Sequence, residues 1–400
     1  MTQVVYLPCE ILTRELDARV ELMRALKDCT VIIGQQWDLF SNANCLPTGL
    51  VLFKTVNQIQ GVNMQRFADA GHVVCALDEE ALLGKDANAL TQAFSELAMD
   101  HCDYFLANNK IHAAAVSEVF GGETIAVGNQ RLDLCRDPKN YAAKAKRIKK
   151  EHGDFVLINT NFGVINSHWG GYNAARGIAK QAGLLETQKQ DDEFTGGAEW
   201  EKTNMASVYQ LIRLCLSKGF KIVLRPHPGE DPKVWKAIPG ITVVEHTVPL
   251  PWLAAAQMSF HCSCTTGLEA AIMGVPTISL KPCHSPISRI NDEINPTVST
   301  PEEAIALMES GVDMREYKRT CREMFPAGAT KKIAHVIRHA APILGFDVRF
   351  NLEKITTRTR LQRTKFSLSP EQAWSTLGKC SPLADSLYIK HPDKKLEAAT

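Results

Sequence analysis

The sequence lacks the features that mark several specialised classes of protein. It contains no apolar run long enough to cross a bilayer, and its first residues have neither the basic region nor the apolar core of a secretory signal. The net charge is +1 over 400 residues, which gives no strong electrostatic preference for nucleic acid. We therefore expect a cytoplasmic globular protein without a nucleic-acid partner.

Motifs for metals and cofactors are also missing. The twelve cysteines show no paired spacing, and Cys262 and Cys264 are too close together for a C-x-x-C motif. No strand is followed by the Asp-x-Asp pair of metal-dependent GT-A transferases, and there is no P-loop, no dinucleotide-binding glycine motif after the first strand and no nucleophile elbow. We expect free thiols, no bound metal and no cofactor.

What the sequence does contain is an alternation of short β-like segments with helical patterns. This alternation predicts parallel sheets that are covered by helices on both faces. It pauses at a basic helical segment, residues 128–150, and restarts at residue 155. The predicted strands are residues 4–7, 31–34, 50–53, 73–76, 104–107 and 124–127 before the pause, and 155–159, 221–224, 242–245, 258–260 and 277–280 after it.

The most informative segment follows the predicted strand 258–260. Ser263, Thr265 and Thr266 stand where a small-residue helix begins, and the N-terminus of a helix suits a phosphate group. Glu269 lies one turn further in, within reach of the sugar hydroxyls of a nucleotide. Two plainer explanations stay open: the hydroxyls cap the helix, and His261, at the end of the strand, is a hydrogen-bonded core histidine.

A second polar segment, residues 225–231, follows another predicted strand. Two prolines stiffen it, so that Arg225 and His227 have fixed directions and could stabilise charge on a departing phosphate. Asp231 could reach an anomeric carbon, and we prefer it to Glu230 for this role. The alternatives are a turn with incidental charges and, for Asp231, a helix cap before Pro232.

Two further segments carry weaker signals. Asn161 follows the predicted strand 155–159 and could line a cleft between domains, although a glycine turn with side-chain hydrogen bonds explains it equally well. In the first half, Glu10 and Arg14 follow the first predicted strand and open a helix. Glu10 and Arg14 are candidates for a cleft role, and the plainer explanation is that acidic residues in a first turn are ordinary complements of the helix dipole.

Two tandem Rossmann-like halves, with the nucleotide motifs in the second, predict an α/β protein of GT-B architecture. We expect the two domains to face each other across a cleft, with an acceptor domain at residues 1–150 and a nucleotide-sugar donor domain at residues 151–330. Residues 331–400 are predicted to be a helical and basic tail that packs back on the domains. Within it, residues 348–365 are expected to be a solvated surface or a contact with an anionic glycan or membrane. Residues 188–203 are predicted to be an exposed loop.

The motifs in their order resemble bacterial surface-carbohydrate biosynthesis proteins with a GT-B fold, and most closely the retaining β-Kdo transferase module of WbbB-type proteins, which work on lipopolysaccharide O-antigen. The resemblance extends over residues 4–295. Its motifs are residues 6–10, 14–17, 128–133, 159–163, 225–228 and 261–269.

The resemblance implies a donor, an acceptor and roles for individual residues. The donor would be CMP-β-Kdo, and the acceptor a GlcNAc-containing glycan, either an oligosaccharide or lipid-linked at the cytoplasmic face of the inner membrane. Asp231 would be the nucleophile of a double displacement that retains configuration. His261 would act with it in catalysis. The implied donor-binding residues are Arg225, His227, Ser263, Thr265, Thr266, Glu269 and Asn161. Because the Kdo carboxylate needs a cation or N–H donors, we expect Lys281 and Arg289, which follow the last predicted strand, to bind it.

Three alternatives remain at this point. One is a nucleotide-sugar epimerase of the UDP-GlcNAc 2-epimerase kind, which shares the GT-B architecture and needs no acceptor. Another is a transferase that uses CMP-sialic acid, because that donor also carries a 2-keto acid. The third is a glycan-binding scaffold without catalytic activity.

Overall fold

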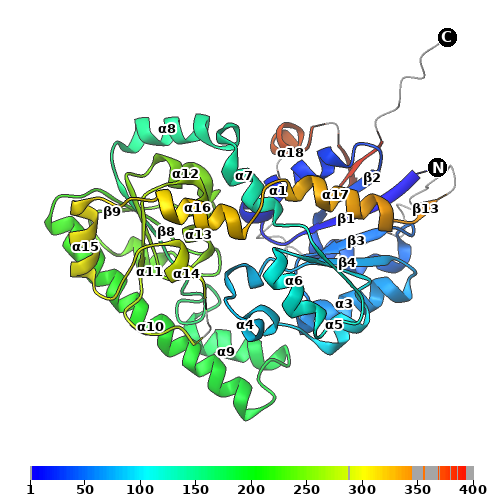
Figure 1. Ribbon diagram of the computed structural model, residues 1–400, viewed down its shortest axis with the longest axis horizontal. Coiled ribbons are helices and arrows are strands. Elements are labelled where there is room, and N and C mark those ends of the chain that lie inside the picture. Colours follow the sequence, from blue (N-terminus) through cyan, green and yellow to red (C-terminus); the bar gives the residue numbers. More distant parts are fainter. Residues whose placement is uncertain are drawn as a thin grey trace, which may run out of the picture. The chain divides into compact units, whose positions relative to one another are not determined.

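The structure is a computed structural model, and it describes residues 2–286, 289–344, 355, 368, 370–378, 380–384 and 386–392. The chain divides into two compact units (Figure 1). Unit 1 is formed by Met1–Leu82, Leu90–Asp133 and Phe325–Thr400, and unit 2 by Leu83–Ala89 and Leu134–Met324. Unit 1 is therefore built from segments on both sides of unit 2 in the sequence.

The sheet of unit 1 is parallel at its centre and antiparallel at one end. Among the described residues its strand order is β14-β15-β2-β1-β3-β4-β5-β6, and β13 also pairs with β1. The pairs from β2 to β6 are parallel, whereas β13, β14 and β15 pair antiparallel. The strands are β1 (Thr2–Cys9), β2 (Thr30–Gln35), β3 (Leu50–Phe53), β4 (Val73–Leu77), β5 (Tyr104–Ala107), β6 (Glu123–Ala126), β13 (Ile343–Leu344), β14 (Ser381–Ala384) and β15 (Leu387–Lys390).

Both faces of this sheet are buried because successive side chains of a strand point to opposite sides. In β1, Val5 and Leu7 join a core cluster with helices α1 (Leu12–Ala25), α17 (Ala329–Ala340) and α18 (Pro370–Leu377). Tyr6 joins the second cluster, which contains side chains of the remaining helices. These are α2 (Gln36–Ser41), α3 (Gln58–Asp69), α5 (Glu96–Asp100) and α6 (Lys110–Ser117).

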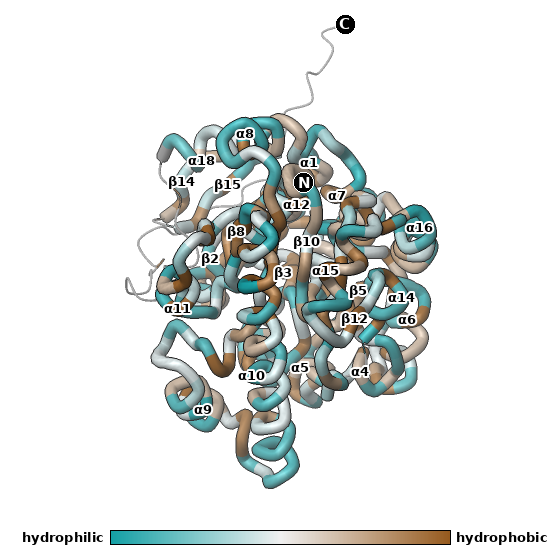
Figure 2. Tube along the Cα trace, turned by 90° about the vertical axis from the view of Figure 1, so that its left-hand side faces the viewer, coloured by the Kyte–Doolittle hydropathy of each residue, from teal (hydrophilic) through white to brown (hydrophobic). Residues whose placement is uncertain are grey.

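Unit 2 is built around a parallel sheet with the strand order β12-β11-β10-β7-β8-β9 in the described part of the chain. Its strands are β7 (Val156–Asn159), β8 (Ile222–Arg225), β9 (Ile241–Val243), β10 (Met258–His261), β11 (Thr277–Leu280) and β12 (Thr297–Val298). The tube drawing shows hydrophobic residues along β8 and β10 and hydrophilic ones along α14 (Asn291–Ile294) and α16 (Arg315–Met324) (Figure 2).

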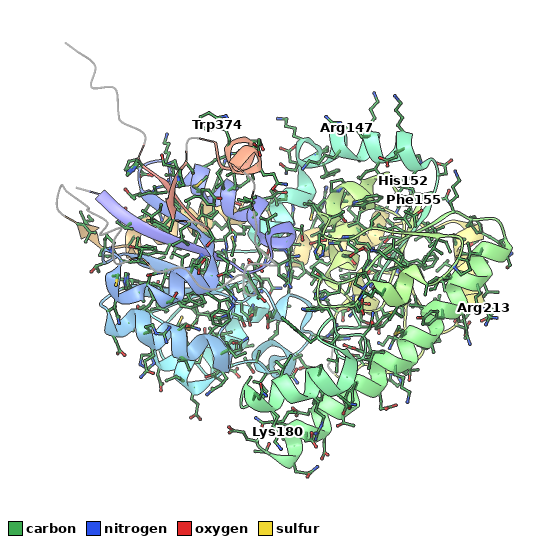
Figure 3. The ribbon with its side chains drawn as sticks, turned by 180° about the vertical axis from the view of Figure 1, so that it is seen from behind. Arg147, His152, Phe155, Lys180, Arg213 and Trp374 are labelled. Carbon is green, nitrogen blue, oxygen red and sulfur yellow. The ribbon has the colours of Figure 1, made fainter. Side chains whose placement is uncertain are left out.

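Helices cover both faces of this second sheet as well. The long helix α10 (Gln188–Ser217) and α15 (Pro301–Ser310) supply one core cluster, while α8 (Ala142–His152), α12 (Pro249–Ala255) and α13 (Thr265–Met273) supply the other. Phe155 belongs to this second cluster, and the ring of His152 lies beside it with the centroids 6.1 Å apart (Figure 3). The remaining elements of unit 2 are α4 (Ala87–Thr91), α7 (Gln130–Arg136, which begins in unit 1), α9 (Gly171–Gln181) and α11 (Lys233–Lys236).

The prediction of an exposed loop at residues 188–203 is wrong. This segment is the first half of α10, which begins with a capping box: the Thr187 side chain accepts from the backbone N–H of Gln190, and the Gln190 side chain accepts from the N–H of Thr187. The segment is polar because only part of the helix surface faces the core, with Trp200 and Asn204 buried and most neighbours exposed.

The units also differ in extent from the predicted domains. The N-terminal part of unit 1 extends to Asp133 rather than to near residue 150, so that α8 belongs to unit 2. After α16 the chain returns to unit 1, where α17 packs against α1 and β15 pairs with β2. The predicted basic segment 348–365 lies outside the described residues apart from Ile355. The predicted cleft between the domains stays a prediction.

Candidate functional site

The carboxyl ends of four strands in unit 2 are in register. Arg225, the last residue of β8, is the partner of Asn159 in β7, which is the partner of His261 in β10, which is the partner of Ser279 in β11. Open parallel sheets bind ligands beyond these ends. The loops that follow β7, β8 and β10 are therefore the candidate site, and they contain the residues predicted for it.

Glu230 is the centre of the loop that follows β8. Its carboxylate accepts four hydrogen bonds: from Thr160 Oγ1 at 2.7 Å and the His227 N–H at 2.9 Å on Oε1, and from Trp235 Nε1 at 2.9 Å and Asn166 Nδ2 at 3.3 Å on Oε2. Glu230 is buried. It thus joins the loops after β7 and β8 into one structure, a role that we did not predict. The sequence feature that could have predicted this role is the position of Glu230 three residues after His227, which is the spacing between the two residues of a capping box.

Asp231 stands next to this anchor but is held differently. Its backbone is fixed by Asn166, whose carbonyl accepts the Asp231 N–H at 2.8 Å and whose Nδ2 donates to the Asp231 carbonyl at 3.1 Å. Its carboxylate is half-buried and accepts the Lys233 N–H at 3.0 Å. This bond belongs to the turn before α11, whose N-cap is Pro232, so Asp231 is not the helix cap that we left open.

Arg225 and His227 occupy fixed positions in the same loop. The guanidinium of Arg225 donates from Nε and Nη2 to the carbonyl of Thr247, at 3.1 and 2.8 Å. His227 Nδ1 accepts the Gly229 N–H at 3.1 Å, so that the ring direction is set from within the loop. His227 also lines a small depression that contains His246, a residue with a left-handed φ of 49°.

His261 is completely enclosed and its ring is fixed on both sides. Nε2 contacts Asn295 Oδ1 at 2.9 Å, and Nδ1 accepts the Cys264 N–H at 3.3 Å. Burial lowers the pKa of His261 from 6.5 to about 4, so the ring is neutral at physiological pH. Gly267 packs so closely that a Cβ atom there would lie 2.3 Å from His261 Nε2. The catalytic role predicted for His261 stays a prediction, and these contacts favour a positioning role.

His261 thereby shapes the turn that leads into α13. Ser263 is buried and has a left-handed φ of 51°, a conformation that costs energy for any residue other than glycine. Its carbonyl accepts a hydrogen bond from Arg289 Nη1. Cys264 is the N-cap of α13, and its Sγ contacts Oγ1 of Thr266. Thr265 begins the helix, followed by the buried residues Thr266 and Glu269.

The loop after β7 is held by helix α10. Oε2 of Glu201 accepts the N–H groups of Val164 and Ile165, both at 2.9 Å, and burial raises the pKa of Glu201 to about 7. Asn161 lies half-buried in this loop, and its Oδ1 has no hydrogen-bond partner among the residues described. An unsatisfied buried amide oxygen is what a ligand-binding position would leave in the free protein.

The two cations predicted for a sugar carboxylate differ in their surroundings. Lys281 forms an ion pair with Asp292, with Nζ 2.7 Å from the carboxylate. Arg289 instead lies over the ring of Trp200 at 5.8 Å and contacts the Ser263 turn. Of the two, Arg289 is the one that the structure places at the start of α13.

The described residues contain no group of three or more His, Cys, Asp or Glu side chains that could hold a metal ion. They also contain no helix with the length and apolar character needed to cross a bilayer.

Comparison with known proteins adds information on the fold. No family model matches the chain, and no curated protein matches its sequence. The S. aureus MnaA structure with UDP is 13% identical, with a TM-score of 0.54 over 85% of this chain and 96% of that one. UDP-GlcNAc 2-epimerase from Methanocaldococcus jannaschii is 12% identical, with a TM-score of 0.49 over 85% of this chain and 100% of that one.

The wall teichoic acid polymerase TagF is 9% identical, with a TM-score of 0.44 over 84% of this chain and 89% of that one. The likenesses to TagF and to the Methanocaldococcus enzyme are too weak to carry an argument. The likeness to MnaA shows a shared fold. Together with the two parallel sheets, it confirms the predicted α/β fold with two Rossmann-like units.

Proposed function

We propose that the chain is a retaining glycosyltransferase that moves β-Kdo from CMP-β-Kdo to a GlcNAc-containing surface glycan through an adduct on Asp231. The observation that carries this proposal is the contrast between two adjacent carboxylates. Glu230 is buried and accepts four hydrogen bonds, whereas Asp231 is half-buried beside it, and its backbone is fixed by Asn166. A nucleophile needs a fixed backbone and an accessible oxygen, and Asp231 has both.

The start of α13 is the proposed binding site for the CMP phosphate. Thr265 and Thr266 contribute backbone N–H groups at the positive end of a nine-residue helix whose N-cap is Cys264. Ser263 adds a hydroxyl from the strained turn, and Glu269, one turn further, binds the cytidine ribose. MnaA, which has this fold, holds UDP, and a pyrimidine nucleotide is also part of CMP-Kdo.

The proposed reaction has two displacements. The Asp231 carboxylate forms a bond to the anomeric carbon of Kdo while the bond from that carbon to the phosphate oxygen breaks, and CMP leaves with the electron pair. An acceptor hydroxyl then attacks the same carbon, its proton passes to solvent, and the carboxylate is released. Two inversions give net retention.

The surrounding residues have distinct parts in this scheme. Arg225 and His227 stabilise the charge on the departing phosphate from the stiff loop after β8. Asn161 offers its amide oxygen to a donor hydroxyl, and Arg289 is the proposed partner of the Kdo carboxylate. His261 holds the Ser263 turn in place. No metal is required, because CMP is a good leaving group.

The acceptor side of the proposal follows from the family resemblance. The glycan would be an O-antigen intermediate of lipopolysaccharide, either free or lipid-linked, and the enzyme would act in the cytoplasm with peripheral contact at the inner membrane. CMP-sialic acid is the second donor to be compared. Its sugar is also a 2-keto acid, so that the reacting anomeric carbon carries a carboxylate as it does in Kdo.

The test is a product assay by mass spectrometry with two variants. The wild type receives CMP-Kdo, generated in situ, with a synthetic GlcNAc-terminated glycan, and we expect a glycan heavier by one Kdo residue. Asp231→Asn should lose turnover and keep CMP binding. Asp313→Asn is the matched control, since Asp313 forms an exposed ion pair with Arg315.

The outcomes separate the alternatives. Full activity of Asp231→Asn would remove Asp231 from the mechanism. Conversion of UDP-GlcNAc without any acceptor, and no transfer from CMP-Kdo, would identify an epimerase. Glycan binding without turnover of either nucleotide sugar would identify a scaffold. Transfer from CMP-sialic acid but not from CMP-Kdo would correct the donor and leave the transferase class standing.

A further inference from the structure

Unit 1 carries a cluster of charged side chains at the carboxyl ends of its central strands. The strands β1, β3 and β4 are neighbours in the sheet. Glu10 follows β1, Lys54 follows β3, and Asp78 and Glu79 follow β4. Further charged and polar residues lie on α1 and at the start of α7. We call this group the α1 charge cluster; it consists of Glu10, Arg14, Glu15, Arg19, Lys54, Asp78, Glu79, Gln130 and Arg131.

The charges of the cluster are paired in space. Lys54 contacts Glu10 and lies 3.3 Å from Glu15. Glu79 lies 3.8 Å from Arg19 and 3.9 Å from Arg131. Burial alone would raise the pKa of Glu79, but the surrounding cations, first among them Arg19, hold it below its usual value. Glu79 is therefore ionised inside the protein.

The cluster balances its charges but leaves hydrogen-bonding groups unused. Arg19 has no exposed surface, and none of its guanidinium nitrogens has a hydrogen-bond partner among the residues that the structure describes. The same holds there for Oδ2 of Asp78, Oε2 of Glu79 and both amide atoms of Gln130. Buried groups of this kind destabilise a fold unless something satisfies them. Their concentration at the ligand-binding edge of a sheet indicates a binding site.

The chemistry of the unused groups narrows the class of ligand. They include donors (Arg19, Gln130) and acceptors (Asp78, Glu79, Gln130), so the ligand must both accept and donate hydrogen bonds. Lys54 is paired with Glu10 and Glu15, and Arg19 and Arg131 lie near Glu79. Because these cations already have carboxylate partners, an anionic ligand would meet repulsion as well as attraction.

The cluster reaches the surface at one side. The Glu10 side chain is 26% exposed, and Arg14 is half-buried on the first turn of α1. The Glu10 N–H donates to Glu15 Oε2 at 2.8 Å, which fixes the chain where it enters the helix. Glu10 and Arg14 therefore form the rim, and Arg19 and Glu79 the interior.

We propose that the α1 charge cluster binds a neutral sugar ring, with Glu10 and Arg14 contacting the sugar and its hydroxyl groups hydrogen-bonding Arg19 and Glu79. A hydroxyl beside both of these side chains accepts from the guanidinium and donates to the carboxylate. Neighbouring hydroxyls of a sugar present donors and acceptors together and add no net charge. If the proposed transferase function is right, this sugar is part of the acceptor; the binding itself does not depend on that function.

The experiment measures binding to the full chain by calorimetry and saturation-transfer NMR. The probes are the methyl glycosides of N-acetylglucosamine, galactose and mannose, with inorganic phosphate as the charged comparison. The test variants are Glu10→Gln and Arg14→Gln, at the rim. The matched controls are Glu21→Gln and Arg24→Gln, an exposed ion pair on the same helix.

We expect at least one glycoside to bind, both rim variants to weaken it about tenfold, and both control variants to bind it like the wild type. Phosphate should not displace the glycoside. The proposal is overturned if no glycoside binds, if the rim variants bind as the wild type does, or if phosphate competes.

The result can be separated from the proposed function. Sugar binding that depends on Glu10 and Arg14, without Kdo transfer, would refute the transferase and support the sugar site. Kdo transfer by the wild type, together with glycoside binding that is unchanged in both rim variants, would refute the sugar site alone. CMP binding, measured in each variant, should be unchanged, because the proposed nucleotide site is in unit 2.

Discussion

The indole N–H of Trp235 donates to Glu230 Oε2 at 2.9 Å, and both side chains are buried. This contact ties the helix α11 to the loop that carries the candidate nucleophile. Trp235 also stacks on Tyr209 of α10, with ring centroids 5.2 Å apart. A local change at Trp235 should therefore affect both the stability of unit 2 and the geometry around Asp231.

The first prediction concerns this contact. Trp235→Phe leaves one oxygen of a buried carboxylate short of a donor, and we expect a loss of about 1–3 kcal/mol in the free energy of unfolding. Denaturant unfolding measures it. Trp169→Phe is the control, because Trp169 is exposed and a surface change of this kind should have little effect. Equal stability of the two variants would contradict a structural role for the contact.

The second prediction uses a glycine that has no room for a side chain. In Gly267→Ala the new Cβ would lie 2.3 Å from His261 Nε2 and 2.5 Å from Asn295 Oδ1, both of them buried. We expect a destabilisation of about 1–3 kcal/mol and weaker CMP binding, since the turn before α13 must shift.

Gly177→Ala provides the comparison for Gly267→Ala. A Cβ at Gly177, in the middle of α9, meets nothing within 4 Å among the described residues, so alanine should be neutral or stabilising by about 0.5–1 kcal/mol. If Gly267→Ala bound CMP normally and unfolded like Gly177→Ala, the close packing around His261 would have no consequence for the site.

The third prediction is a dependence of stability on pH. Burial lowers the pKa of His261 from 6.5 to about 4, so between these values the unfolded chain binds a proton that the folded chain does not. The contribution of His261 is therefore present above pH 6.5 and is lost as the pH falls towards 4. His261→Asn should be less stable at neutral pH but should show a flatter profile over this range. Parallel profiles would assign the acid sensitivity to other groups.

The fourth prediction separates stability from binding at Ser263. Glycine adopts the left-handed conformation of this residue without strain, so Ser263→Gly should keep or raise the stability of the protein. It also removes the hydroxyl proposed to contact the phosphate, and we expect CMP affinity to fall about tenfold, the loss expected for one hydrogen bond to a charged group.

Ser263→Ala is the counterpart, because it removes the hydroxyl and keeps the strain. It should lose the same affinity as Ser263→Gly and be the less stable of the two. Unchanged CMP affinity in both variants would exclude the hydroxyl from the binding site.

Much of the fold could be predicted because buried parallel strands leave a clear signal. The predicted strands 50–53, 104–107 and 277–280 coincide with β3, β5 and β11, and the other eight predicted strands overlap β1, β2, β4 and β6–β10 to within a few residues at either end. The short strands β12–β15 were not predicted. Apolar and β-branched runs bounded by polar turns mark such strands whatever their partners are.

The parts that could not be predicted depend on contacts between distant residues. Strand β15 is recognisable only through its antiparallel pairing with β2, where Tyr388 is the partner of Ile33. The first half of α10 is polar in composition, which is typical of a loop. It is helical because a capping box starts the helix and a few of its side chains are buried against the core. The anchoring role of Glu230 likewise needs donors from Thr160 and Asn166, which no local pattern connects to it.

The pairing of β15 with β2 determines the order in which the chain can assemble during synthesis. The ribosome completes all of unit 2 before it makes α17 and β15, the segments that finish unit 1. The edge of β2 and the apolar side of α1 therefore lie uncovered in the nascent chain while unit 2 emerges. Unit 2 can fold as soon as its last helix leaves the exit tunnel, whereas unit 1 is completed only after β15 has been made.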